Sequence, residues 1–125
     1  MPRNFAEPSH TVLAAVARSA RWRDRIGHLT GESPVAEPSW YHGLLRPHAT
    51  YLEVWETIYH QTLTGPDPVA EWVRGTAARP FLAALGADGA AFLEDYAAAV
   101  RPHYPASADG TTLFPFRRLF IVARP

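Results

Sequence analysis

The sequence predicts a mixed α/β fold. Segments 51–62 and 112–123 are rich in β-branched and aromatic residues, the composition typical of strands. Between them, segment 67–103 repeats apolar residues at helical spacing. Because a two-stranded sheet is marginal in water, we expect the chain to be part of a larger α/β sheet, or to pair with another chain.

Two helices are predicted before the first strand. Apolar residues recur at helical spacing from residue 10 to about residue 25, with Ser9 as the expected N-cap. After a turn-rich stretch, Ser39 is expected to cap a short helix that Pro47 ends.

The two predicted strands both carry large apolar groups. Segment 51–62 contains no glycine or proline and places such groups on both of its faces. Segment 112–123 is weakened near its start by Pro115 and contains an apolar run from Leu119 to Ala123, the pattern of a strand buried on both faces.

The segment between the strands predicts a group of helices. Asp67 is the expected N-cap of the first of them, with Pro68 at its first position. Pro80 interrupts the apolar pattern, and a further helix is expected over residues 88–103. The Asp109-Gly110 pair predicts a turn before the last strand.

Composition excludes several classes of function. The formal net charge of the 125 residues is zero, so no overall field attracts nucleic acid or an anionic membrane. The absence of cysteine excludes disulfides, thiol catalysis and thiolate zinc sites. No apolar run approaches the ~20 residues of a membrane span and no signal peptide is recognised, so we expect one cytoplasmic domain.

Three segments carry a resemblance to a known family. In chain order they are PRNFAEPSH, WETIYHQTLTGPDPVAEWVRGTAARPFL and YPASADGTTLFPFRRLFIVA. From Pro2 to Ala123 the chain resembles the C-terminal half of the trans-aconitate 2-methyltransferase family. The resemblance implies an S-adenosylmethionine-dependent O-methyltransferase that methylates a carboxylate of trans-aconitate or a similar small polycarboxylic acid.

The resemblance also implies an architecture. The chain would be the C-terminal part of a Rossmann-like methyltransferase sheet, with residues 1–4 at the exit of the fifth strand. One unit, 1–125, would comprise a helix-rich segment with the sixth strand (1–62), a small helical cap (63–106) and an antiparallel terminal strand (107–125). The terminal strand would be inserted between its two neighbours.

The glycine-rich cofactor loop of such enzymes is missing from this sequence. The eight glycines never form a GxG-type turn after a strand, and Gly86 with Gly89 comes closest. The chain therefore looks like a truncated enzyme without its N-terminal, cofactor-binding half. S-adenosylmethionine, implied by the family, is not expected to bind this chain alone, and the missing half or a second chain is the expected partner.

Ligands of open α/β sheets bind beyond the carboxyl ends of the parallel strands, which selects the candidate site. A substrate carboxylate is already an anion at neutral pH, so the reaction needs alignment and cationic clamps more than a general base. We assign no catalytic residue. The predicted substrate-binding residues are the hydrogen-bonding side chains Asn4, His10, Tyr59 and His60 and the clamps Arg79, Arg117 and Arg118.

Alternatives remain open for these residues and for the whole chain. Each arginine could instead form a surface ion pair, and His60 could be a structural histidine paired with Glu56 on the same strand face. The six histidines are scattered without metal-ligand spacing, so no metal site is predicted. The alternative function is a non-catalytic module derived from the same fold, which binds a small acid or dimerises.

Overall fold

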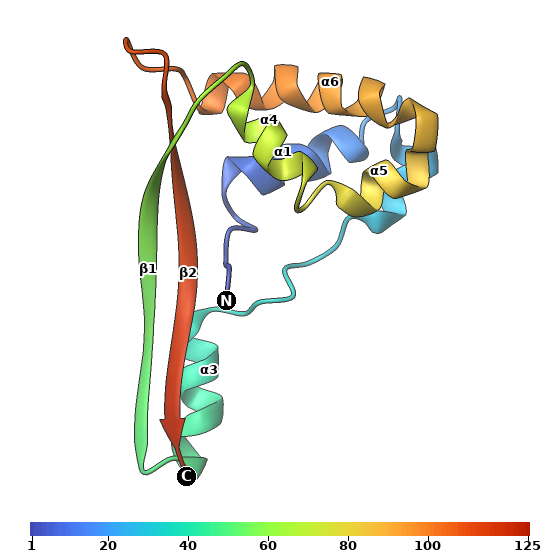
Figure 1. The fold of residues 1–125 in the computed structure, drawn as a ribbon. Coiled ribbons are helices and arrows are strands. Elements are labelled where there is room, and N and C mark those ends of the chain that lie inside the picture. The colour runs from blue at the N-terminus through green and yellow to red at the C-terminus, as the bar shows by residue number, and fades with distance from the viewer.

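The computed structural model describes residues 1–125, and its longest feature is a pair of antiparallel strands (Figure 1). Helices, and not a tight turn, connect the two strands, and the pair is called the hairpin below. Strand β1 (Tyr51–Leu63) pairs with strand β2 (Thr112–Arg124) along their full lengths, so that Tyr51 lies opposite Arg124. The predicted α/β class is confirmed. Both strands lie close to their predicted bounds because their β-branched and aromatic content favours extended backbone.

Most helices gather at the end of the hairpin where β1 stops and β2 starts, while α3 lies along its other end (Figure 1). The helices are α1 (Pro8–Ala17), α2 (Arg23–Ile26), α3 (Pro38–Leu45), α4 (Pro68–Arg74), α5 (Arg79–Leu85) and α6 (Gly89–Val100). Short 3₁₀ turns follow four of them: η1 (Gly27–Leu29), η2 (Arg46–His48), η3 (Gly86–Asp88) and η4 (Arg101–His103). No helix has the length and apolar character needed to cross a membrane.

The N-terminal segment pairs with the free edge of β2. Pro2 forms an antiparallel bridge with Arg118, and the backbone N–H of Arg3 donates to the carbonyl oxygen of Arg117 at 3.0 Å. Strand β2 therefore lies between the N-terminal segment and β1 and runs antiparallel to both. This is the arrangement predicted for the inserted terminal strand.

The prediction of one helix over residues 10–25 is wrong. Helix α1 ends at Ala17, and a turn intervenes before α2 begins at Arg23. In the turn, the hydroxyl of Ser19 donates to the carbonyl oxygen of Val16 at 2.6 Å. Such a local bond competes with the helical pattern, and the break turns Trp22 into the core, where it is 4% exposed.

The predicted serine caps are also wrong. The N-cap positions of α1 and α3 are occupied by Glu7 and Glu37, each followed by a proline at the first helical position. Ser9 and Ser39 therefore lie inside their helices. Proline decides these boundaries because its missing N–H and fixed φ suit the first helical position.

Asp67 occupies the predicted N-cap position of α4 but does not cap the helix with its side chain. Its backbone is left-handed, with φ of 47°. Its carboxylate instead accepts two hydrogen bonds from the guanidinium of Arg101, at 2.8 and 2.9 Å. The pair lowers the pKa of Asp67. The residue thus ties the start of α4 to the end of α6.

The hydrophobic core lies among the helices and reaches only the beginning of β2. Phe92 and Tyr96 of α6 are fully buried in it, and the Tyr96 hydroxyl donates to the carbonyl oxygen of Ser9 at 2.8 Å. The Tyr104 hydroxyl accepts a hydrogen bond from the Ser9 N–H at 3.1 Å and so caps the start of α1. Two tyrosines therefore fix α1 against the cap helices.

The far part of the hairpin is much more exposed than the helical end. Leu119 is buried, but Val122 is 40% exposed, so the prediction that the apolar run 119–123 is buried on both faces is wrong for this chain. Tyr51, Trp55 and Tyr59 share the face of Val122 and are exposed as well. On this face the rings of Trp55 and Phe120 stack with centroids 5.3 Å apart.

Candidate functional site

A cavity of about 910 Å³ lies where the helices meet the end of the hairpin. Its walls are the N-terminal segment, one face of α1, the loop over residues 29–37, helix α4, the start of α5 and the start of β2. Phe114 and Phe116 of β2 lie opposite Gln61 and Tyr59, near the end of β1. The cavity is therefore at the sheet edge that topology predicts for a ligand.

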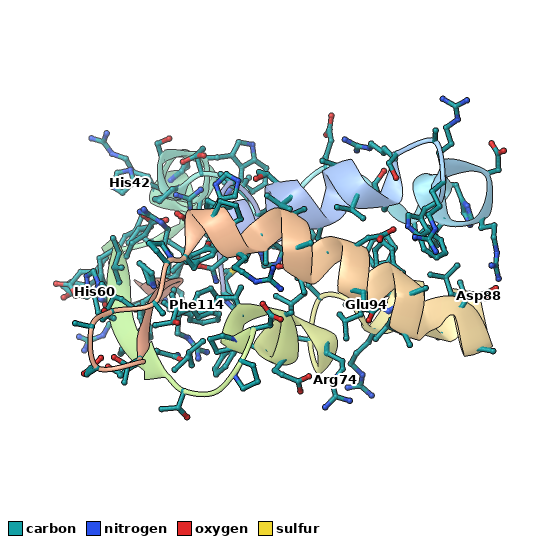
Figure 2. The ribbon with its side chains drawn as sticks, turned by 90° about the horizontal axis from the view of Figure 1, so that it is seen from above. His42, His60, Arg74, Asp88, Glu94 and Phe114 are labelled. Atoms are coloured by element: carbon teal, nitrogen blue, oxygen red, sulfur yellow. The ribbon has the colours of Figure 1, made fainter.

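The deep wall of the cavity is aromatic. Trp72 of α4 lies with its ring centroid 5.8 Å from that of Phe114 and 6.0 Å from that of Phe116. Figure 2 shows Phe114 among the side chains between the helices. These rings pack against the core cluster and so hold a preformed apolar surface for the carbon skeleton of a ligand.

Helix α1 supplies much of the polar wall. His10, Thr11 and Arg18 line the cavity with Ala14, at the spacing of residues on one helix face. The Nδ1 of His10 lies 3.3 Å from the Ser9 hydroxyl, and its ring packs on Phe5 with centroids 4.9 Å apart. Burial lowers the pKa of His10, so at neutral pH it is a hydrogen-bonding group and not a cation.

Arg18 is a cavity residue that the sequence did not select. In the helical repeat of the sequence, Arg18 lies opposite the apolar stripe of α1, which is the usual position of a solvated charge. The signal that could have found it is its spacing of eight residues from His10, about two helical turns along the same helix. Its Nε donates to the hydroxyl of Thr30 at 2.7 Å.

Asn4 lies on the cavity wall, but its amide is used by the backbone. Its Oδ1 accepts from the N–H of Arg117 at 2.7 Å, and its Nδ2 donates to the carbonyl oxygen of Arg117 at 3.2 Å. Asn4 is only 3% exposed. Its side chain therefore pairs with β2 as a strand backbone would.

A network of ion pairs lies next to Asn4. It links five side chains of alternating charge: Glu37, Arg3, Glu56, Arg117 and Glu7. Arg3 binds Glu56 and, at 3.1 Å, Glu37; Arg117 binds Glu56 at 2.8 Å and Glu7 at 3.6 Å. The hydrogen bond from Arg3 is the main cause of a lowered pKa at Glu56, and Arg117 adds to it. The network of ion pairs ties the N-terminal segment to both strands.

This network corrects one interpretation of the sequence. The alternative that His60 is a structural histidine paired with Glu56 is wrong, because the Glu56 carboxylate is held by Arg3 and Arg117. The two guanidinium groups are stronger partners because they stay charged and present several donors.

The predicted substrate-binding residues are only partly brought together. Asn4 and His10 line the cavity, and Arg117 lies directly behind Asn4. The other four are exposed and are not among the lining residues: Tyr59, His60, Arg79 and Arg118. In Figure 2, His60 lies at the outer edge of the hairpin.

The residues of this chain do not fit the cofactor that the resemblance implies. The link from β1 to α4, residues 64–67, contains one glycine, Gly65, with φ of 91°. Prolines at 66 and 68 remove two of the amide donors that a phosphate or carboxylate cradle would need. Gly86 begins the turn η3 and Gly89 is the first residue of α6, so a helix and not a strand precedes them. No group of three His, Asp or Glu side chains could hold a metal ion.

Sequence comparisons place this geometry in a family context. No protein-family model matches the chain. It is 43% identical over 124 residues to a trans-aconitate 2-methyltransferase of Azoarcus sp. strain BH72, covering 98% of this chain and 48% of the relative. Proteins of the same name from Streptomyces avermitilis and Streptomyces coelicolor are each 46% identical, over 98% and 99% of this chain and 46% and 42% of their own lengths.

The match extends along nearly the whole of this chain, but the chain spans about half the length of the curated relatives it matches. Identities above 40% in each of these three comparisons agree with the motif resemblance noted in the sequence. The predicted resemblance is thus confirmed, and the chain is related in sequence, from end to end, to the trans-aconitate 2-methyltransferase family.

Proposed function

We propose that this chain is the substrate-side, C-terminal portion of an S-adenosylmethionine-dependent O-methyltransferase. The proposed reaction is methylation of a carboxylate of trans-aconitate or a similar small polycarboxylic acid. The observation that supports it is the cavity at the sheet edge, in a chain that matches relatives of that name over 98% of its length. The name of those relatives supplies the substrate class, and the cavity supplies a place for it.

In this proposal the chain binds and orients the acid, and none of its residues acts as a general acid or base. A carboxylate is an anion at neutral pH and is already a nucleophile, so its alignment is the main requirement. Neutral His10 can donate a hydrogen bond to it without being protonated. The aromatic wall of Trp72, Phe114 and Phe116 excludes water from the carbon skeleton.

The helical segment 63–106 is proposed to act as a cap over the substrate. It contributes Trp72 and Thr76 to the cavity, while the strands and α1 provide the opposite wall. Asn4 and Arg117 support that wall through their mutual hydrogen bonds. Direct contacts of Tyr59, His60, Arg79 and Arg118 with the acid remain predictions, to be tested by single substitutions.

S-adenosylmethionine is proposed to be held by the half of the enzyme that the relatives have and this chain does not span. The test joins this chain to the unmatched half of the Azoarcus relative and measures methyl transfer to trans-aconitate. We expect methylated acid from the joined protein and none from either half alone. A well-folded joined protein that binds S-adenosylmethionine but does not methylate the acid would contradict the proposal.

Acid binding by this chain is tested separately by calorimetry. Titration with trans-aconitate should give saturable binding, whereas its neutral trimethyl ester should bind much more weakly because it lacks the anionic groups. Equal binding of acid and ester, or no binding of the acid by the folded chain, would contradict a carboxylate site.

The exposed face of the hairpin favours a second candidate, a dimerising module of the same fold. Tyr51, Trp55 and Val122 form an exposed apolar patch of a kind that soluble monomers rarely leave uncovered. The sheet also has only two strands, which is marginal for a sheet in water. Sedimentation of the wild type and of Trp55→Glu tests this candidate. A concentration-dependent dimer that Trp55→Glu dissociates would support it, and a wild-type monomer at all concentrations would exclude it.

A further inference from the structure

We infer that Arg18 is the cation that binds a carboxylate of the ligand in the cavity. The inference rests on the proposed function and names a residue of its substrate site. Two arginines line the cavity, Arg3 and Arg18. Arg3 is held by the carboxylates of Glu56 and Glu37, so it has no charge left unpaired for a ligand.

The ion pairs of the whole chain single out Arg18. Six of the twelve arginines have a carboxylate partner: Arg3, Arg21, Arg25, Arg74, Arg101 and Arg117. The other six have none: Arg18, Arg23, Arg46, Arg79, Arg118 and Arg124. Among these six, Arg18 is the one that lines the cavity.

The guanidinium of Arg18 is oriented for this role. Its Nε donates to the hydroxyl oxygen of Thr30 at 2.7 Å, and that hydroxyl donates in turn to the carbonyl oxygen of Gly27 at 2.7 Å. The Thr30 proton is thus directed to Gly27, and its lone pair faces Arg18. Both terminal nitrogens of Arg18 remain without a protein acceptor, the arrangement that allows a two-point bond to a carboxylate.

The position of Arg18 in the cavity suits a small acid with an apolar skeleton. The residue lies at the C-terminal end of α1, and His10 lies near its start on the same wall. An acid bound by the cation can place its carbon skeleton against the aromatic wall, and His10 supplies a neutral hydrogen-bonding group on the same side of the cavity. Glu32 also lines the cavity without a cationic partner and repels an anion.

A cation at the end of a helix also interacts favourably with the helix dipole, so a purely structural role must be separated from ligand binding. The matched control is Arg23, five residues further along, which is exposed and without a carboxylate partner like Arg18 but does not line the cavity. Arg18→Gln and Arg23→Gln remove the same charge.

The experiment is calorimetric titration of the 125-residue chain with trans-aconitate and with its neutral trimethyl ester. Arg18→Gln should weaken binding of the acid at least about tenfold, the effect expected for loss of charge-assisted hydrogen bonds, while Arg23→Gln should change it less than about twofold. Binding of the ester should not respond to either change. Arg18→Lys should restore part of the affinity, because it restores the charge without the two-point geometry.

Two further variants test the same site while Arg18 stays in place. Thr30→Val removes the acceptor that orients Arg18 and should weaken acid binding about threefold. Glu32→Gln removes a like charge and should strengthen it about twofold to fivefold. Urea unfolding of each variant establishes that it is folded under the conditions of the titration.

The outcomes separate this inference from the proposed function. Acid binding by the wild type that Arg18→Gln leaves unchanged would overturn the inference and leave the proposed function standing. A drop in stability of Arg18→Gln with unchanged acid affinity would assign Arg18 a structural role, which also overturns it. No acid binding by the folded wild type would overturn both.

Discussion

Asn4 completes the edge of the sheet by pairing its side-chain amide with the backbone of Arg117, to which it both donates, at 3.2 Å, and accepts, at 2.7 Å. The arrangement substitutes a side chain for a strand backbone at the point where the N-terminal segment turns away toward α1. Asn4 is a predicted ligand contact, yet these bonds to the β2 backbone leave its side chain buried. Asn4 therefore supports the cavity wall from behind.

Replacement of Asn4 should destabilise the protein in a graded way. In Asn4→Ala the N–H of Arg117 loses its acceptor, whereas its carbonyl oxygen keeps a bond from the Arg3 N–H at 3.0 Å. We expect a loss of about 1–3 kcal/mol in the free energy of unfolding, measured by urea denaturation. Asn4→Asp keeps the acceptor for the Arg117 N–H but replaces the Nδ2 donor with an oxygen that faces the Arg117 carbonyl oxygen at a buried site, so it should lose more. Equal stability of Asn4→Ala and wild type would show that the amide bonds add nothing.

Glu56 should make stability depend on pH in the acid range. Because Arg3 and Arg117 lower its pKa in the folded protein, the unfolded chain binds the proton more readily. The stability from this group is present above the ordinary value of 4.5 and is lost as pH falls through the lower folded pKa. Glu56→Gln should lower stability by about 1–3 kcal/mol at pH 7 and flatten the dependence below pH 4.5.

The measurement for Glu56 is the urea midpoint from pH 7 down to the onset of acid unfolding. Glu71→Gln is the control, because Glu71 forms an exposed ion pair with Arg74 within one helix, a pair of small energetic effect. A Glu56→Gln curve parallel to that of the wild type would remove Glu56 from the acid transition.

His10 should act in a different pH window. Burial lowers its pKa below the ordinary 6.5, so the neutral ring is the form that the fold accepts. Stability from this site is full above pH 6.5 and falls as pH drops through the folded pKa. NMR titration of the His10 ring should give a midpoint below 6.5, and His10→Phe should flatten stability in that interval. A midpoint above 6.5 would contradict the burial argument.

The two tyrosines that hold Ser9 should each contribute to stability. Tyr96→Phe removes the donor to the Ser9 carbonyl oxygen, and Tyr104→Phe removes the acceptor of the Ser9 N–H. We expect each change to lower the free energy of unfolding by about 1–2 kcal/mol, because each leaves one backbone group of Ser9 without that partner. Exposed Tyr51→Phe is the control and should have little effect. Retention of full stability in both single variants would mean that packing alone fixes α1.

Much of the fold could be predicted from local sequence. The ends of both strands were predicted to within one residue. The first strand has no glycine or proline and is rich in Tyr, Val, Trp and Ile, whereas the second contains Pro115 within an otherwise aromatic and aliphatic run. The break after Ala17 could not be found in this way. Trp22 leaves the helical pattern because its ring packs edge-on against Phe92 and its Nε1 donates to Asp95 at 2.8 Å, contacts some seventy residues away in sequence.

The candidate site was predictable as a place but only partly as a set of side chains. Sheet topology selects the edge of the sheet at which Asn4, His10 and the start of β2 line the cavity. It could not tell which arginines were already neutralised, because the partners of Arg117 and Arg3 come from three separate parts of the chain. Nor could it select Arg18, whose exposure to the cavity depends on the path of the loop over residues 29–37.

The position of β2 between two earlier segments has a consequence for the order of folding. Asn4 and Arg117 are 113 residues apart, so their bonds close a loop that includes every helix and all of β1. Closing so long a loop is entropically costly, and contacts of this separation slow folding. During synthesis residues 2–4 are made long before residues 117 and 118, so their pairing with β2 follows the release of β2 from the ribosome. The cavity wall that this segment forms is therefore among the last parts of the molecule to be completed.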